Sequence, residues 1–466
     1  MRKKEAANPS LANFSNSTGS LFGFLITELL FFVMMGIDKD AQVVTFLGLI
    51  LLVFAVVNVF TVTKYNNNEQ ATLLLGSGLL LIFGLLGALG AVFDNRSFLG
   101  FVLLAFGFIT FFLLGFLITG LDGGNIKIVM HGIFIGLGIL VLITLLVNMY
   151  NYSFFYLIRY KGYVFYYDGV PVQISNQVKF LLGLDFVFAN QSVAGFYNIL
   201  LASVLLPTLL FFKDFKQKYT KWLYLGLGIL GVISLAFYPN VRALILFVPL
   251  IGALLVIRFY DSQKKWLKPT LYVLLGLFAI FLLFAFFWAF DVVDIFKHIP
   301  LLRRIFGSGT LGRWKDVLKK ATWFGYNSWG IYEQQATGNL LLDVLYQFGI
   351  LAFIVLIIFI AFSGYQVYRY YKNSGDSKLV KFIIISYLLT LFVISFFDYP
   401  YHPLIEIGGE IRSINHNPIL TNGAFMVAMA LIGYTISAQF KLEEALVLSE
   451  EMIENESEVI THEKSE

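Results

Sequence analysis

Long apolar runs alternate with short polar stretches along almost the whole chain. Each run has close to the ~20 residues that an α-helix needs to cross about 30 Å of hydrocarbon. The runs are continuous and do not alternate residue by residue, which excludes a transmembrane β-barrel. We expect about twelve spans, at 20–36, 42–63, 72–93, 98–120, 126–149, 193–212, 222–237, 241–257, 270–290, 340–362, 382–397 and 419–438. The pattern therefore predicts an all-α polytopic membrane protein with a lipid bilayer as its surroundings.

Composition excludes several classes of protein. Of the 466 residues, 58% are hydrophobic and 13% charged, whereas soluble proteins have about 25% charged residues. The mean hydropathy of +0.79 is that of a membrane protein. The chain has no cysteine, so disulfides, thiolate zinc sites and a cysteine nucleophile are excluded. A net charge of +4 gives no electrostatic basis for nucleic-acid binding.

The distribution of Lys and Arg predicts the orientation, because cytoplasmic loops of membrane proteins are enriched in both. With the N-terminus inside, the inner segments hold most of the basic residues. The four short outer loops carry one each: Lys39, Arg96, Arg242 and Arg412. No small-residue cleavage site follows the first apolar run, so we expect that span to be retained. Both termini are expected in the cytoplasm, as in a multi-pass protein of the cytoplasmic (inner) membrane.

Two regions are expected. Residues 1–440 form the helical bundle, with a large extracytoplasmic loop at 291–339 between the ninth and tenth spans. Residues 441–466 hold nine Glu and two Lys. They are expected to begin as an amphipathic helix and to end as a solvated acidic cytoplasmic tail.

The two longer outer loops, 150–192 and 291–339, are basic and so oppose the topological bias. Their charges either contact lipid headgroups or form a site for an anionic substrate on the outer face. The basic residues of the second loop are Lys297, Arg303, Arg304, Arg313, Lys315, Lys319 and Lys320.

Arg242 is the clearest charge at a membrane edge. Pro239 and Asn240 indicate a tight turn before it, and Arg242 begins the following helix. Its guanidinium either extends to the interface as a snorkelling anchor or binds a phosphate through two parallel hydrogen bonds.

The stretch from Arg313 to Ala321 has the spacing of an amphipathic helix, with Trp314, Val317 and Leu318 on one face. Such a helix would lie in the interface, with Trp314 as anchor and basic groups toward the headgroups. Arg313 at its start would face the same outer vestibule as Arg242. Lys315, Lys319 and Lys320 are expected on a solvated or headgroup-facing surface.

Asn339, Asp343 and Gln347 share one helix face at the start of the tenth span. This face either borders a wet cavity or joins helices by hydrogen bonds. The last outer loop, Asp398–Pro418, contains His402 and His416. Its possible ligands show no metal-binding spacing, and its prolines predict an irregular loop. A proton acceptor is the better interpretation of these side chains.

Three stretches together resemble the O-antigen ligase and Wzy-type polymerase superfamily of bacterial membrane glycan transferases. They are Phe188–Phe196, which enters a span; Val241–Leu246, with an Arg-x-x-x-Leu element at a helix start; and Gly312–Tyr326, with a Gly-Arg…Trp…Gly-Tyr pattern. Asn339 and Gly349 fit the His-Asn-x9-Gly element that follows in the family. The likeness covers residues 185–365. The order of these elements along the chain, and their positions relative to the predicted spans, agree with the family pattern.

The sequence departs from the family pattern at two positions. Gly338 stands where ligases carry a His proposed as catalytic, and Asn327 replaces the last glycine of a Gly-Tyr-Gly element. Either His402, His416 or Glu333 supplies the base, or the protein is polymerase-like and relies on arginines.

The resemblance implies transfer or polymerisation of a glycan from an undecaprenyl-diphosphate-linked donor to a sugar hydroxyl of a glycan acceptor on the outer face. It implies Arg242 and Arg313 as stabilisers of the diphosphate, with neither a metal nor another cofactor, and other polysaccharide-assembly membrane proteins as further partners. The substrate-binding residues expected around them are Arg303, Arg304, Lys315, Trp314, Trp323, Tyr326, Asn339 and Asp343. The alternative is a polysaccharide or lipid-linked oligosaccharide flippase without catalysis, which should carry more ionisable groups in mid-span than these nearly charge-free runs.

Overall fold

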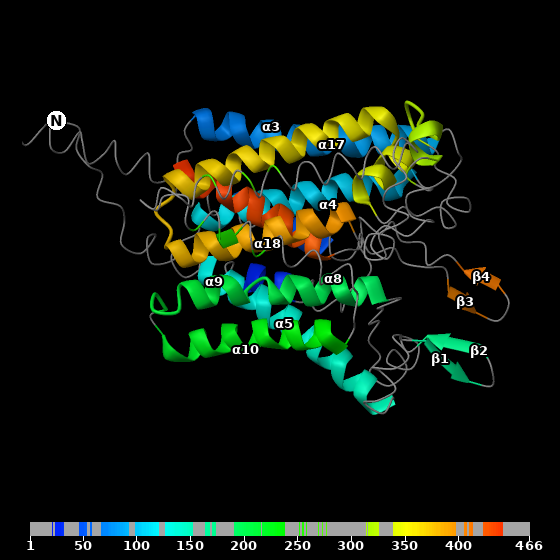
Figure 1. Cartoon of the computed structure of the whole chain (residues 1–466). Helices are drawn as coiled ribbons and strands as arrows, with labels where there is room; N and C mark the ends of the chain where they lie inside the picture. Colours follow the sequence, from blue (N-terminus) through cyan, green and yellow to red (C-terminus); the bar gives the residue numbers. More distant parts are fainter. Residues whose placement is uncertain are drawn as a thin grey trace, which may run out of the picture.

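The computed structural model describes residues 21, 24–31, 46–53, 56–57, 67–92, 98–120, 126–151, 164–167, 170–173, 191–215, 217–237, 314, 316–325, 339–397, 405–407, 410–412 and 423–440, and isolated positions between 251 and 276. The longer described helices are α3 (Asn67–Val92), α4 (Phe98–Leu117), α5 (Ile126–Asn151), α8 (Gln191–Ala202), α9 (Leu205–Leu210), α10 (Lys218–Phe237), α17 (Leu340–Asn373), α18 (Lys378–Phe397) and helix Gly423–Phe440. They lie side by side with their axes along the long direction of Figure 1.

Helix Gly423–Phe440 is the most enclosed of these helices, since every one of its residues is buried. Glycines allow its close approach to α4. A Cβ at Gly115 would overlap the carbonyl of Ala430, and a Cβ at Gly433 would overlap the carbonyl of Phe112. Small residues allow the backbones of membrane helices to come into van der Waals contact in this way.

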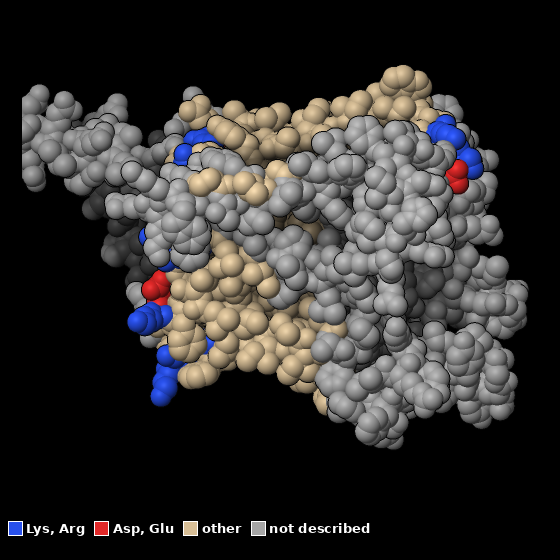
Figure 2. Space-filling model, viewed as in Figure 1, with Lys and Arg blue, Asp and Glu red and all other residues tan. Residues whose placement is uncertain are grey.

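Five described helices are long and apolar enough to cross a membrane. They are Asn68–Leu89, Ile126–Ile143, Phe348–Asn373, Lys378–Ser395 and Gly423–Phe440. Large apolar side chains such as Leu74, Leu75 and Ile358 are exposed on the outer faces of these helices. The charged side chains visible in Figure 2 gather at the two ends of the bundle. This distribution is that of a protein surrounded by lipid, and the predicted helical membrane class is confirmed.

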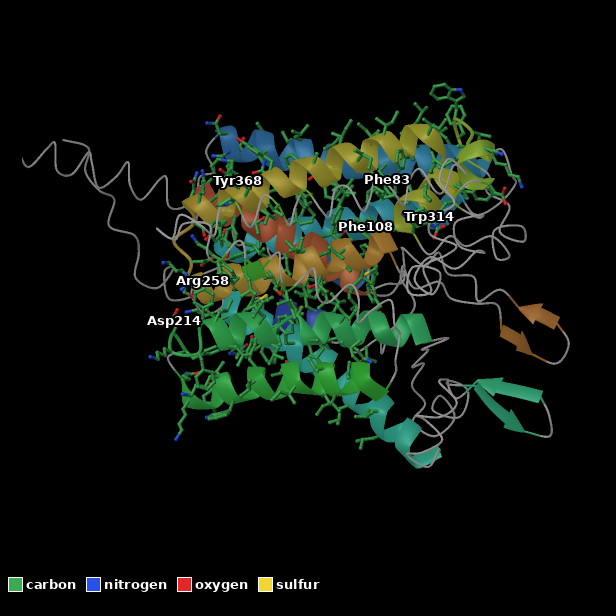
Figure 3. All side chains as sticks on the ribbon, in the orientation of Figure 1. Phe83, Phe108, Asp214, Arg258, Trp314 and Tyr368 are labelled. Atoms are coloured by element: carbon green, nitrogen blue, oxygen red, sulfur yellow. The ribbon has the colours of Figure 1, made fainter. Side chains whose placement is uncertain are left out.

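The two ends of the bundle can be distinguished by labelled residues. Asp214, Arg258 and Tyr368 lie at one end, and Trp314 lies at the opposite end (Figure 3). We call these the Arg258 end and the Trp314 end. Three segments are predicted to face the same side of the membrane: 213–221, 258–268 and 369–381. Their described parts lie at the same end of the bundle, the Arg258 end.

Two short antiparallel hairpins lie beyond the Trp314 end (Figure 1). β1 (Val164–Tyr167) pairs with β2 (Val170–Gln173), and β3 (Ile405–Ile407) pairs with β4 (Glu410–Arg412). The sequence predicts helices as the regular elements, and an irregular loop at 398–418. Both hairpins lie in predicted outer loops, where alternating apolar and polar residues are too few to stand out beside the membrane spans.

Two helices differ from their predicted spans. The span expected at 193–212 is divided into α8 and α9 by a turn at Ser203 and Val204, where the Ser386 hydroxyl donates to the carbonyl of Ser203 over 2.6 Å. α17 continues to Asn373, beyond the expected 340–362, and has a kink at Gly349, where φ is 87° and ψ is 176°.

Candidate functional site

A short amphipathic helix, residues 314 and 316–320, lies at the Trp314 end. Val317 is buried, whereas Asp316, Lys319 and Lys320 are exposed. The predicted amphipathic pattern and the exposed lysines are therefore present. Trp314 is only 7% exposed, so its ring contributes to packing and is not displayed at the surface.

The apolar face of this helix packs on the beginning of α17. Val317 forms a cluster with Leu345 and Tyr346, against which Leu318 and Ala321 also pack. The side chains on one face of the short helix, three and four positions apart, thus meet side chains of one face of α17. This contact joins the region of Arg313 to the region of Asn339 in space, although no motif spacing in the sequence requires it.

The chain that follows the short helix, residues 321–325, lies against the kink of α17. The amide of Ile350 donates to the carbonyl of Thr322 over 2.9 Å, and the amide of Leu351 donates to that of Trp323 over 3.4 Å. At Gly349 a Cβ would overlap the carbonyl oxygen of Trp323 and would lie 2.5 Å from the amide nitrogen of Gly325. Glycine has no Cβ that would enter this space, and only glycine adopts a φ of 87° without strain.

The kink supplies the polar partners that this loop needs. A continuous α-helix would direct the amides of Ile350 and Leu351 to carbonyls four residues earlier. With Gly349 out of the helical region, both amides instead bind the loop. The glycine of the predicted Asn-x9-Gly element is thus the residue that receives the Trp323-Phe324-Gly325 stretch of the preceding element.

Asn339 begins α17 as its N-cap. Its side-chain oxygen accepts from the amides of Leu341 at 2.9 Å and Leu342 at 3.2 Å. Such a cap satisfies amides that the first turn of a helix leaves without partners. Asp343, one turn later, is buried, as is Asn339. Both lie on the predicted common face, and the acidic side chain suits the positive end of the helix dipole.

Trp323 and Phe324 are the aromatic side chains that this assembly exposes among the described residues 314 and 316–325. Trp323 is 62% exposed and Phe324 is 40% exposed. Exposed rings beside Lys319 and Lys320 form an amphipathic surface at the membrane boundary, which can contact either headgroups or a sugar. We call residues 314 and 316–325 together with the first three turns of α17 the kink assembly.

Four of the predicted site residues belong to the kink assembly: Trp314, Trp323, Asn339 and Asp343. The others lie outside the described residues: Arg242, Arg303, Arg304, Arg313, Lys315, Tyr326, Glu333, His402 and His416. The proposed meeting of Arg242 and Arg313, and the choice of base, therefore stay predictions. Among the described residues, no group of three or more His, Asp or Glu has the arrangement of a metal site.

A polar cluster that was not predicted from the sequence lies at the Arg258 end. Asp376 accepts hydrogen bonds from the hydroxyls of Tyr370 and Tyr434, each at 2.7 Å. Beside it the buried amine of Lys381 donates to the carbonyls of Ser374 at 2.7 Å and Tyr371 at 3.0 Å. The cluster joins the turn between α17 and α18 to helix Gly423–Phe440. The signal for it was Asp376 and Lys381 lying within five positions of each other between two apolar runs.

A second polar contact lies at the same end. The Ser437 hydroxyl donates to Glu69 over 3.2 Å and also contacts the Thr119 hydroxyl. Gln439 donates to Gln366 over 2.7 Å. These contacts involve the last turns of helix Gly423–Phe440, whose polar residues alternate with apolar ones. They fix the helix against α3, the turn Ile118–Gly120 after α4, and α17, and none of them touches the kink assembly.

No family model matches this chain, and a search of curated proteins finds no match. The described helices establish a membrane protein whose best-formed assembly of motif residues lies at the Trp314 end.

Proposed function

We propose that this protein is a membrane glycan transferase that uses a polyprenyl-diphosphate-linked oligosaccharide as donor at the Trp314 end. The observation that carries the proposal is the contact between the loop at Trp323 and the kink at Gly349. Two sequence elements that each resemble a piece of the glycan transferase superfamily meet there in space.

The proposed topology has twelve spans, a large extracytoplasmic loop at 291–339, and both termini in the cytoplasm. Lys213, Lys218, Arg369, Lys372 and Lys378 belong to the Arg258 end, and this supports a cytoplasmic position for that end. The Trp314 end would then face outward, where lipid-linked glycans are assembled in the proposed reaction.

The proposed reaction is a displacement at the anomeric carbon of the donor. An acceptor sugar hydroxyl attacks that carbon and forms a new glycosidic C–O bond. The bond from the anomeric carbon to the diphosphate breaks, and its electron pair leaves with the polyprenyl diphosphate. The hydroxyl proton passes to a base, for which Glu333, His402 and His416 are the candidates.

Negative charge grows on the diphosphate as that bond breaks. Arg242 and Arg313 are proposed to stabilise it, because guanidinium groups bind phosphate oxygens in pairs. Arg313 directly precedes Trp314, whose buried ring anchors the short helix to the bundle. Effective electrostatic catalysis requires charged groups that are positioned before the substrate binds, and Arg313 is proposed to meet this condition.

The remaining proposed contacts concern the sugars. Trp323 presents an exposed ring, and Tyr326 follows it three positions later. Arg303, Arg304 and Lys315 are proposed to hold the diphosphate or acidic sugars. Gly338 in place of the ligase His favours polymerisation of repeat units over ligation.

The test is a transfer reaction with the purified protein in liposomes and a polyprenyl diphosphate oligosaccharide as both donor and acceptor. We expect longer glycans, and a loss of about 10²–10³-fold in rate for Arg242→Ala and for Arg313→Ala. Lys319→Ala is the matched control, because Lys319 is exposed on the same short helix. Movement of intact donor across the bilayer without a new glycosidic bond would favour the flippase instead. Full activity in both folded arginine variants would exclude the proposed site.

A further inference from the structure

The Arg258 end carries a strong excess of positive charge. The described basic residues there are Lys127, Lys213, Lys218, Lys221, Arg258, Arg369, Lys372, Lys378 and Lys381. The described acidic residues at this end are Glu69, Asp214 and Asp376, of which Glu69 and Asp376 accept hydrogen bonds inside the bundle. Figure 2 shows basic side chains along the left edge of the molecule, at this end.

Two of these amines lie over aromatic rings. The Lys221 amine lies 4.5 Å from the centre of the Phe212 ring, on which Trp222 packs edge-on at 5.6 Å. The Lys372 amine lies 4.7 Å from the centre of the Tyr368 ring. Trp222 and Tyr368 are each more than half exposed. We call these two groups, which lie at the same end of the bundle, together with Lys213 and Lys218 the basic–aromatic rim.

The sequence after residue 440 has the complementary pattern. Glu443, Glu450, Glu454 and Glu458 are spaced so that a helix would carry them on one face. Leu442, Leu446, Ile453 and Ile460 would share the neighbouring face of the same helix. An acidic face suits amines, and an apolar face suits exposed rings.

The point of attachment places this segment within reach of the rim. Helix Gly423–Phe440 ends in Phe440, whose buried ring lies 5.3 Å from the guanidinium of Arg369. A flexible chain of the length of 441–466 spans about 28 Å on average. Such a tether gives an effective concentration of about 1 mM.

The membrane surface is a poor alternative for this segment. The inner leaflet is negatively charged, and nine Glu against two Lys give residues 441–466 the same sign. We propose that residues 441–466 dock on the basic–aromatic rim of their own chain, with the glutamates toward the lysine amines and the apolar face toward Trp222 and Tyr368. This proposal does not depend on the glycan transferase function.

The absence of cysteine from the chain allows two spin labels to be placed without other changes. One label goes at Tyr219→Cys, an exposed position between Lys218 and Lys221, and the other at Ser457→Cys in the acidic segment. Distances are measured by pulsed electron resonance on the full chain in nanodiscs of neutral lipid. We expect a defined short-distance population, lost when salt shortens the Debye length from about 30 Å to about 3 Å.

Two variants separate docking from chance proximity. Replacing Lys213, Lys218 and Lys221 by Gln should abolish the short-distance population, and replacing the four face glutamates by Gln should do the same. The matched control replaces Lys319 and Lys320, exposed lysines of the opposite end, by Gln and should leave it unchanged. A short distance that survives both rim and tail variants overturns the proposal.

The same experiment tests two other occupants of the rim, a second copy of the chain and anionic lipid. If the short distance vanishes on dilution with unlabelled protein, the segment binds a second copy, and docking on its own chain is wrong. If it vanishes when the nanodisc contains anionic phospholipid, lipid headgroups occupy the rim in a membrane, and the proposal is likewise overturned. Retention of the short distance in both samples supports it.

Discussion

Gly349 lies directly against the backbone of Trp323, because the kink of α17 leaves the room that a side chain would fill. The loop carbonyls of Thr322 and Trp323 accept the two amides that the kink releases from the helix. A single glycine therefore determines where the exposed loop sits on the bundle.

The first prediction concerns this glycine. In Gly349→Ala, the added Cβ would overlap Trp323, and φ of 87° would strain the backbone. We expect a loss of at least about 1–3 kcal/mol, seen as a lower midpoint of thermal unfolding and faster proteolysis of the loop. Gly364→Ala in the same helix is the matched control, since nothing lies within 4 Å of a Cβ there. That control should gain about 0.4–1 kcal/mol; equal effects of the two substitutions would refute the role of the kink.

The second prediction concerns the N-cap of α17. Asn339→Ala removes the acceptor for the amides of Leu341 and Leu342 and should lower the free energy of unfolding by about 0.5–2 kcal/mol. Asn339→Ser keeps a neutral acceptor at the N-cap and should retain most of the stability. Chemical denaturation of both variants in detergent measures this difference. If Asn339→Ser keeps stability but loses transfer activity, the amide has a role in the substrate site beyond capping.

Sequence patterns predicted the helical class and the positions of most of the described helices, because the apolar runs are long compared with any irregularity within them. The predicted span 126–149 nearly coincides with α5, and 98–120 with α4 and the short turn after it. The break between α8 and α9 was missed although Pro207 indicates it, because proline has no N–H to donate to the carbonyl of Ser203, four residues earlier. That carbonyl accepts from the Ser386 hydroxyl instead. Local patterns contain no information about this distant partner.

The candidate site was predictable only in part. The spacing of Val317, Leu318 and Ala321 indicated a helix and its buried face correctly. It could not indicate that Trp314 is buried, because an interfacial anchor and a packed ring have the same spacing. The kink at Gly349 depends on a contact with the loop at 322–325, which only the three-dimensional structure reveals.

The third prediction concerns the cluster around Asp376. Tyr434→Phe removes one of the two hydroxyls that donate to this carboxylate, and should cost about 1.5–3 kcal/mol, as expected for a hydrogen bond to a charged group. Combining it with Tyr370→Phe should give a non-additive loss, with a coupling of about 0.5–3 kcal/mol. Tyr365→Phe, on an exposed position of α17, should change stability by less than about 0.5 kcal/mol. Simple additivity in this double-mutant cycle would show that the two hydroxyls act independently.

The fourth prediction separates sugar binding from lipid anchoring at Trp323. If its exposed ring stacks on a sugar, Trp323→Ala should raise KM by about 2- to 10-fold, corresponding to about 0.5–1.5 kcal/mol of aromatic contact. kcat and the thermal midpoint should change little, because the ring is 62% exposed and supports little of the fold. Trp323→Phe keeps an aromatic face and should recover most of the affinity. Trp222→Ala is the matched control, an exposed tryptophan of the Arg258 end, and it should leave KM unchanged. An equal rise of KM in both alanine variants would mean that each tryptophan acts by anchoring the protein in the interface, and sugar stacking at Trp323 would be refuted.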